Sequence, residues 1–143
     1  MALHLIKLCV GAQSVEALAG WQERRLSPLR RASEPLVLQH ITRQMPKRRD
    51  AILDGGSLYW VIRGHIAARQ RIVDLRQTSR DGLPHCAICY DAHLVPVARR
   101  AHRPFQGWRY LEPSDAPADL QESSGGNDLP EDLRAELSEL GLL

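Results

Sequence analysis

The chain has little cysteine and no long apolar run. It also lacks the positively charged segment followed by an apolar stretch that is expected of a secretory signal. Three cysteines among 143 residues are too few, and odd in number, for a disulfide framework, and they favour a reducing, cytoplasmic location. No apolar run approaches the ~18 residues of a membrane-spanning helix. The opening residues MALHLIKLCVGA are interrupted by His4 and Lys7, unlike a signal peptide. We therefore predict no membrane association.

Motifs that identify common enzyme classes are also lacking. Gly55-Gly56 is not followed by the Lys-Ser/Thr of a phosphate-binding loop, and no Gly-x-Ser-x-Gly elbow occurs. The one metal-like cluster is HCAICYDAH at residues 85–93. Its Cys86 and Cys89 are three positions apart on a predicted strand, which directs them to opposite faces. We predict no metal and no cofactor, and a binding module in preference to an enzyme.

The chain is rich in arginine, and its basic and acidic residues are unevenly distributed along the sequence. Arginine accounts for 17 of the 19 basic residues. Residues 1–111 have a net charge of +10, whereas residues 112–143 have a net charge of −8. Arginine suits bidentate phosphate contacts and stacking on planar rings, so the basic part favours a polyanion that the acidic part could screen. The alternative is a solvated arginine-rich surface.

Apolar patterning predicts an α+β body over residues 1–111, in which a small curled sheet or barrel has helices at one end. Ser14 is the predicted N-cap of the first helix. The loop between the first helix and the second strand is predicted at 25–35, and a turn at 76–82. The predicted strands are 3–10, 36–43, 57–63, 66–75, 83–91, 93–98 and 105–111, and the predicted helices are 15–26 and 45–53.

The run GGSLYWVIRGHIAARQRIVDLR (55–76) is the densest in strand-forming residues. Residues 57–63 have apolar side chains on both faces, which is typical of an interior strand and predicts that Trp60 is buried. In the next strand Arg69 and Arg71 share a side with Val73 and Leu75, which indicates a bulge or a half-exposed edge.

After residue 111 the composition changes twice. Residues 112–127 are rich in proline, serine, glycine and acids, which predicts a flexible linker. Residues 128–141 have an Asp-x-x-Glu capping box and a leucine stripe, which predict an amphipathic helix. This helix would dock on the body or bind a protein partner through Leu129, Leu133, Leu137 and Leu140.

Aromatic and arginine residues alternate in YWVIR and FQGWRY. Sheets and small barrels hold single-stranded nucleic acid with aromatic platforms beside cations. His4 and His40 fall on predicted strands and are interpreted as structural histidines. The alternative for the aromatic residues is a place in the core, with arginine side chains reaching solvent. The predicted ligand-facing residues are Tyr59, Arg63, Arg69, Arg71, Trp108 and Arg109.

The segments LHLIKL, SVEALAGWQ, HITRQMPKRRDAILDGGSLYWVIRG and RPFQGWRYLEPSDAPADL resemble a bacterial family, domain of unknown function fourteen-eighty-nine, over about residues 2–120. That family implies no activity. The order of short helix, glycine turn and two strands is similar, at the level of architecture, to PUA-like domains such as ASCH and EVE modules. This likeness implies a nucleic-acid-binding module for RNA or modified bases. The alternatives are a protein-interaction module and an enzyme acting on small molecules or nucleotides.

Overall fold

The computed structural model describes residues 2–9 and 11–120 and shows, over that part of the chain, seven strands in one mixed sheet with two α-helices. The predicted α+β class is confirmed. The elements are β1 (His4–Leu8), α1 (Val15–Arg31), β2 (Val37–Thr42), α2 (Arg49–Leu53), β3 (Ser57–Ile62), β4 (His65–Arg80), β5 (Leu83–Asp91), β6 (Val95–Ala101), β7 (Trp108–Leu111) and the 3-10 turn η1 (Pro113–Asp115).

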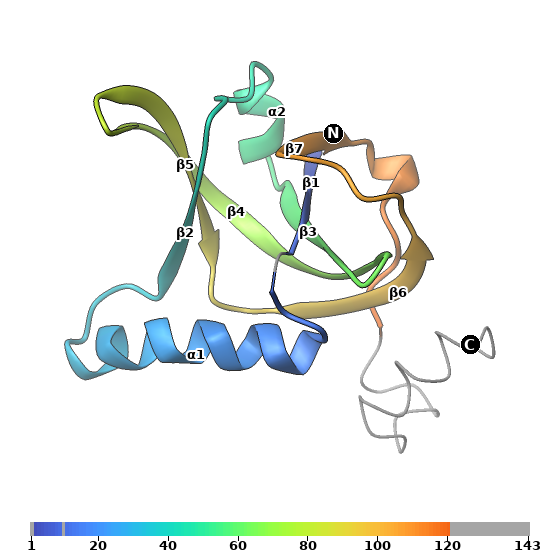
Figure 1. Ribbon diagram of the computed structural model, residues 1–143, viewed down its shortest axis with the longest axis horizontal. Helices are drawn as coiled ribbons and strands as arrows, with labels where there is room; N and C mark the ends of the chain where they lie inside the picture. The colour runs from blue at the N-terminus through green and yellow to red at the C-terminus, as the bar shows by residue number, and fades with distance from the viewer. Residues whose placement is uncertain (1, 10, 121–143) are drawn as a thin grey trace.

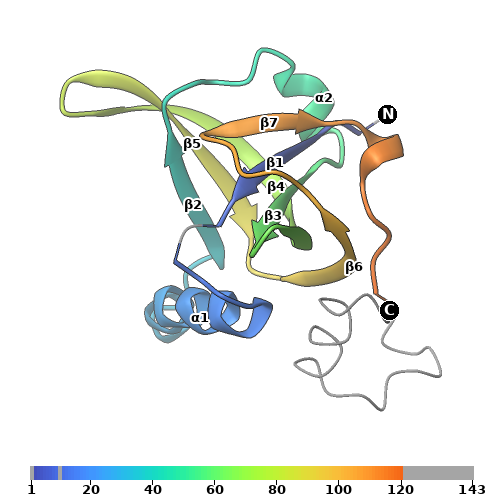
Figure 2. The ribbon, with the colours of Figure 1, turned by 45° about the vertical axis from the view of Figure 1, so that its right-hand side comes forward.

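The sheet is strongly curled, and α1 lies across one of its open ends (Figures 1 and 2). The strand order is β2-β5-β4-β3-β1-β7, with β6 paired to the first part of β4. Only β1 and β3 run parallel among the described pairs. The two edge strands β2 and β7 are joined through the segment after β2, because the indole N–H of Trp108 donates to the carbonyl of Gln44 at 3.0 Å.

The interior strand predicted in the 57–63 region is confirmed, because every residue of β3 is buried. β3 and β4 are joined by a tight turn in which Arg63 and Gly64 both have positive φ, 51° and 81°. A two-residue turn of this kind matches the twist of the strands and favours glycine. The predicted bulge is also confirmed, since the register of β4 shifts near Ala67 and again near Val73.

The second bulge explains the mixed pattern of β4. The extra residue shifts the alternation of side chains between the two faces of β4, so Ile72 and Leu75 are buried while Val73 is exposed. The turn predicted at 76–82 is wrong for residues 76–80, which continue β4 to Arg80. Their polar side chains do not suggest a strand, but their backbones are hydrogen-bonded to β5 in the antiparallel ladder. Only Asp81 and Gly82 remain to turn the chain between Arg80 and Leu83.

The helix α1 begins as predicted but is longer. The Ser14 side chain accepts a hydrogen bond from the backbone N–H of Ala17 at 3.0 Å, so Ser14 is its N-cap. The loop predicted from residue 25 is wrong up to residue 31, because α1 continues through Pro28 to Arg31. Its buried stripe faces the open end of the sheet and consists of Val15, Leu18, Gln22 and Leu26.

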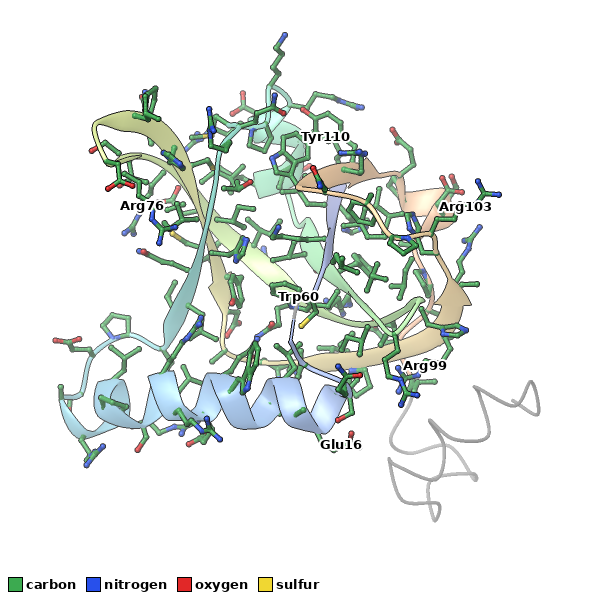
Figure 3. All side chains as sticks on the ribbon, in the orientation of Figure 1. Glu16, Trp60, Arg76, Arg99, Arg103 and Tyr110 are labelled. Atoms are coloured by element: carbon green, nitrogen blue, oxygen red, sulfur yellow. The ribbon has the colours of Figure 1, made fainter. Side chains whose placement is uncertain are left out.

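The apolar interior has two parts, one on each side of β1 and β3. The larger part includes Leu58 and Trp60 and extends to α1 and β5. Figure 3 shows Trp60 inside the curl of the sheet, with Arg76, Arg99 and Arg103 at the periphery. The smaller part lies toward β6 and consists of Ile6, Tyr59, Val61, Ile66, Val97 and Leu111.

Residues 112–120 of the predicted linker lie against the body. The backbone N–H of Ala98 donates to the carbonyl of Ala118 at 2.8 Å, and that of Leu120 donates to Pro96 at 3.0 Å. Two acids of this segment form ion pairs with arginines of the body, Glu112 with Arg48 and Asp119 with Arg69. Residues 121–127 of the linker, and the helix predicted at 128–141, lie outside the described residues. No helix in the described part is both long and apolar enough to cross a membrane.

Candidate functional site

The six residues predicted to face a ligand do not form one surface. Tyr59 was expected on the outside, but its side chain is only 4% exposed, so its predicted place on an accessible surface is wrong. The physical reason is that segment 112–120, together with β6 and β7, covers the face of β3 that carries Tyr59. Its ring packs edge-on against His4 at 5.1 Å. A base cannot stack on it.

Arg69 lies next to Tyr59 in the register of β3 and β4, and its charge is already neutralised. Its Nε and Nη2 atoms donate to the two carboxylate oxygens of Asp119 at 2.7 and 2.6 Å, and Nη1 donates to Ser57 at 3.1 Å. Bidentate pairs of this kind are among the stronger ionic contacts in proteins. The same hydrogen bonds hold the pKa of the Asp119 carboxyl below its usual range. Arg69 therefore fastens the chain at Asp119 to the sheet.

Arg63 and Arg71 are exposed, Arg63 in the β3–β4 turn and Arg71 on β4. Trp108 and Arg109 are in β7, at the other end of the curled sheet. Trp108 is half-buried against the larger core. Its ring meets Tyr110 edge-on at 5.0 Å between centroids.

The structure reveals a cavity that the sequence did not indicate. It has a volume of about 250 Å³ and lies between α1 and the sheet, at the open end described above. Its walls come from β1, α1, β2, β3 and β5, five segments far apart in the chain. The lining residues are Lys7, Leu8, Cys9, Leu18, Trp21, Gln22, Arg25, His40, Trp60 and Tyr90.

A buried hydrogen-bond network fixes the inner wall of this cavity. Gln70 is fully buried, and its Oε1 accepts from Trp60 Nε1 at 2.9 Å and from Gln22 Nε2 at 2.8 Å. Its Nε2 donates to Gln22 Oε1 at 2.7 Å and to the carbonyl of Asp91 at 3.0 Å. The indole N–H can only donate, so it determines the orientation of both amides. Gln22 retains one N–H and one oxygen lone pair with no partner among the described residues.

Two further polar groups at the cavity have no hydrogen-bond partner in the described part of the chain. One is the Tyr90 hydroxyl, whose residue is only 2% exposed. The other is the ring of His40, whose closest aromatic neighbour is Trp60, edge-on at 6.2 Å. Buried polar groups are nearly always hydrogen-bonded in folded proteins. Unpartnered groups around a cavity are therefore a sign that a ligand or water completes them.

The protonation of these groups is set by burial and by two nearby cations. Burial lowers the pKa of His40 to about 4, and the charges of Lys7 and Arg25 act in the same direction. Burial raises the pKa of Tyr90 to about 12. At neutral pH the cavity thus contains a neutral imidazole, which can donate and accept, and a protonated hydroxyl. His40 is half-buried and packs against Trp60 without a hydrogen-bond partner among the described residues, whereas His4 accepts a bond from the Ser57 backbone N–H at 3.0 Å.

The outer wall of the cavity is Trp21, which is 39% exposed. Its indole ring rests on Gly11, where an added Cβ would lie 2.5 Å from the ring. Gly11 also has a φ of +98°, which disfavours any other residue. Beyond Trp21, a shallow surface formed with Arg24 and Arg25 continues toward solvent. A flat group entering the cavity would pass this aromatic and cationic rim.

The cysteines are placed as the strand prediction requires. Cys86 and Cys89 are both in β5 and fully buried, with the Cys86 sulfur 3.6 Å from that of Met45. Within the described residues no group of three histidine, cysteine or acidic side chains is arranged to hold a metal. Cys9 lines the cavity, and burial raises the pKa of its thiol.

The fold and the cavity together define a small α+β domain with a helix-capped cleft at one end of a curled sheet. The chain belongs to the family described as Protein of unknown function (DUF1489), whose family model matches residues 5–143. The resemblance found in the sequence segments is thereby confirmed. No curated protein and no solved structure matches the chain, so the likeness to PUA-like domains stays a prediction.

Proposed function

We propose that this domain is a nucleic-acid-binding module that holds an unpaired base of single-stranded RNA, ordinary or modified, in the cavity between α1 and the sheet. The observation that carries the proposal is the set of unused hydrogen-bonding groups on three side chains, Gln22, His40 and Tyr90, around a cavity with aromatic walls. Single-stranded RNA is recognised by bases that leave the stack, contact aromatic rings and form hydrogen bonds through their edges.

The size of the cavity favours a base over a larger group. Its volume of about 250 Å³ is just below the roughly 300–1,000 Å³ of typical small-molecule pockets. Trp60 and Tyr90 meet edge-on at 5.9 Å between centroids and form an apolar inner surface. The indole N–H of Trp60 donates to Gln70, whereas the Tyr90 hydroxyl has no partner among the described residues. A heterocycle with donors and acceptors on its rim matches this combination better than an aliphatic ligand does.

The charges favour a phosphate at the mouth of the cavity. Lys7 and Arg25 line the cavity, and neither has a carboxylate partner among the described residues. Burial lowers the pKa of Lys7, and an anion beside its amine would favour the charged form. Basic residues that neutralise phosphates give an affinity that falls steeply with salt. Single-stranded RNA is the ligand that this chemistry fits.

The enzymatic alternative has less support from the cavity. Its one thiol is Cys9, and a thiol with a raised pKa is a poor nucleophile. His40 has the lowered pKa of a base that stays neutral, but no nucleophile is hydrogen-bonded to it within the described chain. A site that binds without breaking a bond is the simpler interpretation of these side chains.

The test compares the RNA affinity of two variants, each of which replaces one arginine by glutamine and so removes one positive charge. Fluorescence anisotropy with a labelled single-stranded RNA pool should show binding at low salt, with less binding by Arg25→Gln. The magnitude of the log–log salt slope of that variant should fall by about 0.7, the value for one phosphate contact on a single strand. Arg71→Gln is the matched control, because Arg71 is exposed on β4 and does not line the cavity.

Two results would overturn the proposal. One is the absence of binding to any single-stranded RNA or DNA at low salt. The other is a loss of affinity with Arg71→Gln but not with Arg25→Gln, which would move the interface to the outer face of β4. Trp21→Ala provides a second check, because loss of a stacking wall should cost roughly 1–3 kcal/mol with little change in the salt slope.

A further inference from the structure

A second, more open cavity follows the first along the opening between the edge strands β2 and β7. We call it the β2/β7 groove; it has a volume of about 550 Å³. The groove is shaped by the end of β2, the start of β5 and the loop before β7. It is lined by Thr42, Arg43, Gln44, Leu83, Pro84, Gln106, Gly107, Trp108 and Arg109.

The strand register places the groove next to the cavity. Lys7 lines the cavity, and its direct partner across β1 and β7 is Trp108, which lines the groove. On β2, His40 lines the cavity and Thr42 lines the groove. Two residues along a strand span about 6.6 Å. The two sites therefore lie about 6.6 Å apart along β2, the strand that contributes residues to both.

The groove has two arginines that form no ion pair within the described residues. Arg43 and Arg109 form no ion pair with any carboxylate in the described part of the chain. The guanidinium of Arg109 is nevertheless held in place, since its Nη1 donates to the carbonyls of Gln106 and Trp108 at 3.0 and 3.2 Å. The Cζ atom of Arg109 lies 5.5 Å from the centre of the Phe105 ring. The remaining N–H groups are free to bind an anion, and a positioned guanidinium loses little entropy when it does so.

The groove also has an aromatic surface of fixed orientation. The indole N–H of Trp108 donates to Gln44, and the ring is braced edge-on by Tyr110. Tyr110 is itself fixed, because its hydroxyl accepts from the backbone N–H groups of Lys47 and Arg48 at 3.0 and 3.2 Å. Figure 3 shows Tyr110 at the end of the molecule opposite α1. Trp108 can therefore support a second planar group without rearrangement.

From these observations we infer that the ligand is an oligonucleotide of at least two nucleotides, and not a free nucleotide. It crosses from the cavity to the β2/β7 groove, where Arg43 and Arg109 bind its phosphodiester and Trp108 contacts the neighbouring base. This inference rests on the proposed function, because it takes the cavity as the place of the first base. It goes beyond that function in assigning a second subsite and in requiring a polymer.

The experiment measures the affinity of the full chain for two probes, a single-stranded RNA pentamer and a mixture of nucleoside 5′-monophosphates, by calorimetry. The wild type should bind the pentamer at least tenfold more tightly than the monophosphates. Arg43→Gln and Arg109→Gln should each weaken pentamer binding about tenfold, since hydrogen bonds to charged groups contribute about 1.5 kcal/mol or more. Neither change should alter monophosphate binding. Arg99→Gln is the matched control, because Arg99 is on β6 and does not line the groove.

The outcomes separate this inference from the proposed function. Equal affinity for pentamer and monophosphates, or pentamer affinity unchanged within twofold in both groove variants, would refute the groove. If Trp21→Ala then still weakened both probes, the cavity would stand alone. Loss of pentamer binding in the groove variants with no effect of Trp21→Ala would refute the first base site instead. A DNA pentamer, run in parallel, shows whether the 2′-hydroxyl contributes to recognition.

Discussion

Replacement of Gln70 by leucine tests the buried network that shapes the cavity. Leucine is similar in size to glutamine but removes all four hydrogen bonds of the side chain. Two of the groups left behind, the Trp60 indole N–H and the Gln22 amide, belong to residues that are only 4% exposed. The third, the Asp91 carbonyl, belongs to an exposed residue and can be hydrated. The cost should therefore come from two buried groups.

Each buried group left unsatisfied costs about 1–3 kcal/mol, and the apolar leucine recovers part of this. We expect Gln70→Leu to lower the free energy of unfolding by about 3 kcal/mol. Urea denaturation followed by tryptophan fluorescence measures the change, because Trp60 is part of the network. A loss below about 1 kcal/mol would show that water or a rearranged side chain satisfies these groups.

The double variant Gln22→Leu, Gln70→Leu is the control for this explanation. Removal of both amides leaves only the Trp60 N–H and the hydrated Asp91 carbonyl without their partner, so the double variant should be less destabilised than the sum of the two single variants. A coupling energy of about 1–2 kcal/mol is expected for groups in direct contact. Strict additivity would refute the reciprocal amide pair.

Three more predictions concern the cavity and its surroundings. The pKa of His40 is lowered to about 4 in the folded protein, so folding favours the neutral ring. The stability that the neutral ring contributes should be complete above about pH 6.5 and lost as the pH falls toward 4. In the His40→Gln variant, the urea midpoint should therefore change less with pH between these two values. Gly11→Ala should cost about 1–2 kcal/mol, seen as a lower urea midpoint, and shift the tryptophan emission, because its Cβ would meet Trp21 at 2.5 Å; an unchanged spectrum and midpoint would contradict this packing. Removal of residues 121–143 takes away a net charge of −5 and should raise affinity for heparin or RNA if this segment screens the basic body, whereas equal affinity before and after truncation would exclude screening.

The elements with a regular apolar pattern could be predicted from the sequence. β3 shows apolar residues on both faces, and Ser14 precedes a clear helical stripe. The extent of β4 could not be predicted, because residues 76–80 are polar and become a strand only through pairing with β5. The end of α1 was missed for a related reason, since Pro28 is usually a helix breaker.

The candidate site could be predicted only in outline. Trp108 and Arg109 were predicted to face a ligand because they are adjacent in an aromatic and arginine-rich strand, and both line the β2/β7 groove. The neutralisation of Arg69 depends on Asp119, fifty residues away in the chain, and no local pattern indicates that pair. The cavity is assembled from single residues of five elements, such as Gln22 and His40. Each has an ordinary neighbourhood in sequence, so only the folded chain shows that their polar groups converge.

The most direct test of the base site is protection of Cys9 from alkylation. Cys9 lines the cavity and is 9% exposed, whereas Cys86 and Cys89 are fully buried and serve as internal controls. Mass spectrometry would follow iodoacetamide labelling of the full chain with and without saturating single-stranded RNA. We expect RNA to slow labelling of Cys9 several-fold while the other two cysteines stay unlabelled in both samples. RNA that binds at saturation but leaves the labelling rate of Cys9 unchanged would show that no base occupies the cavity.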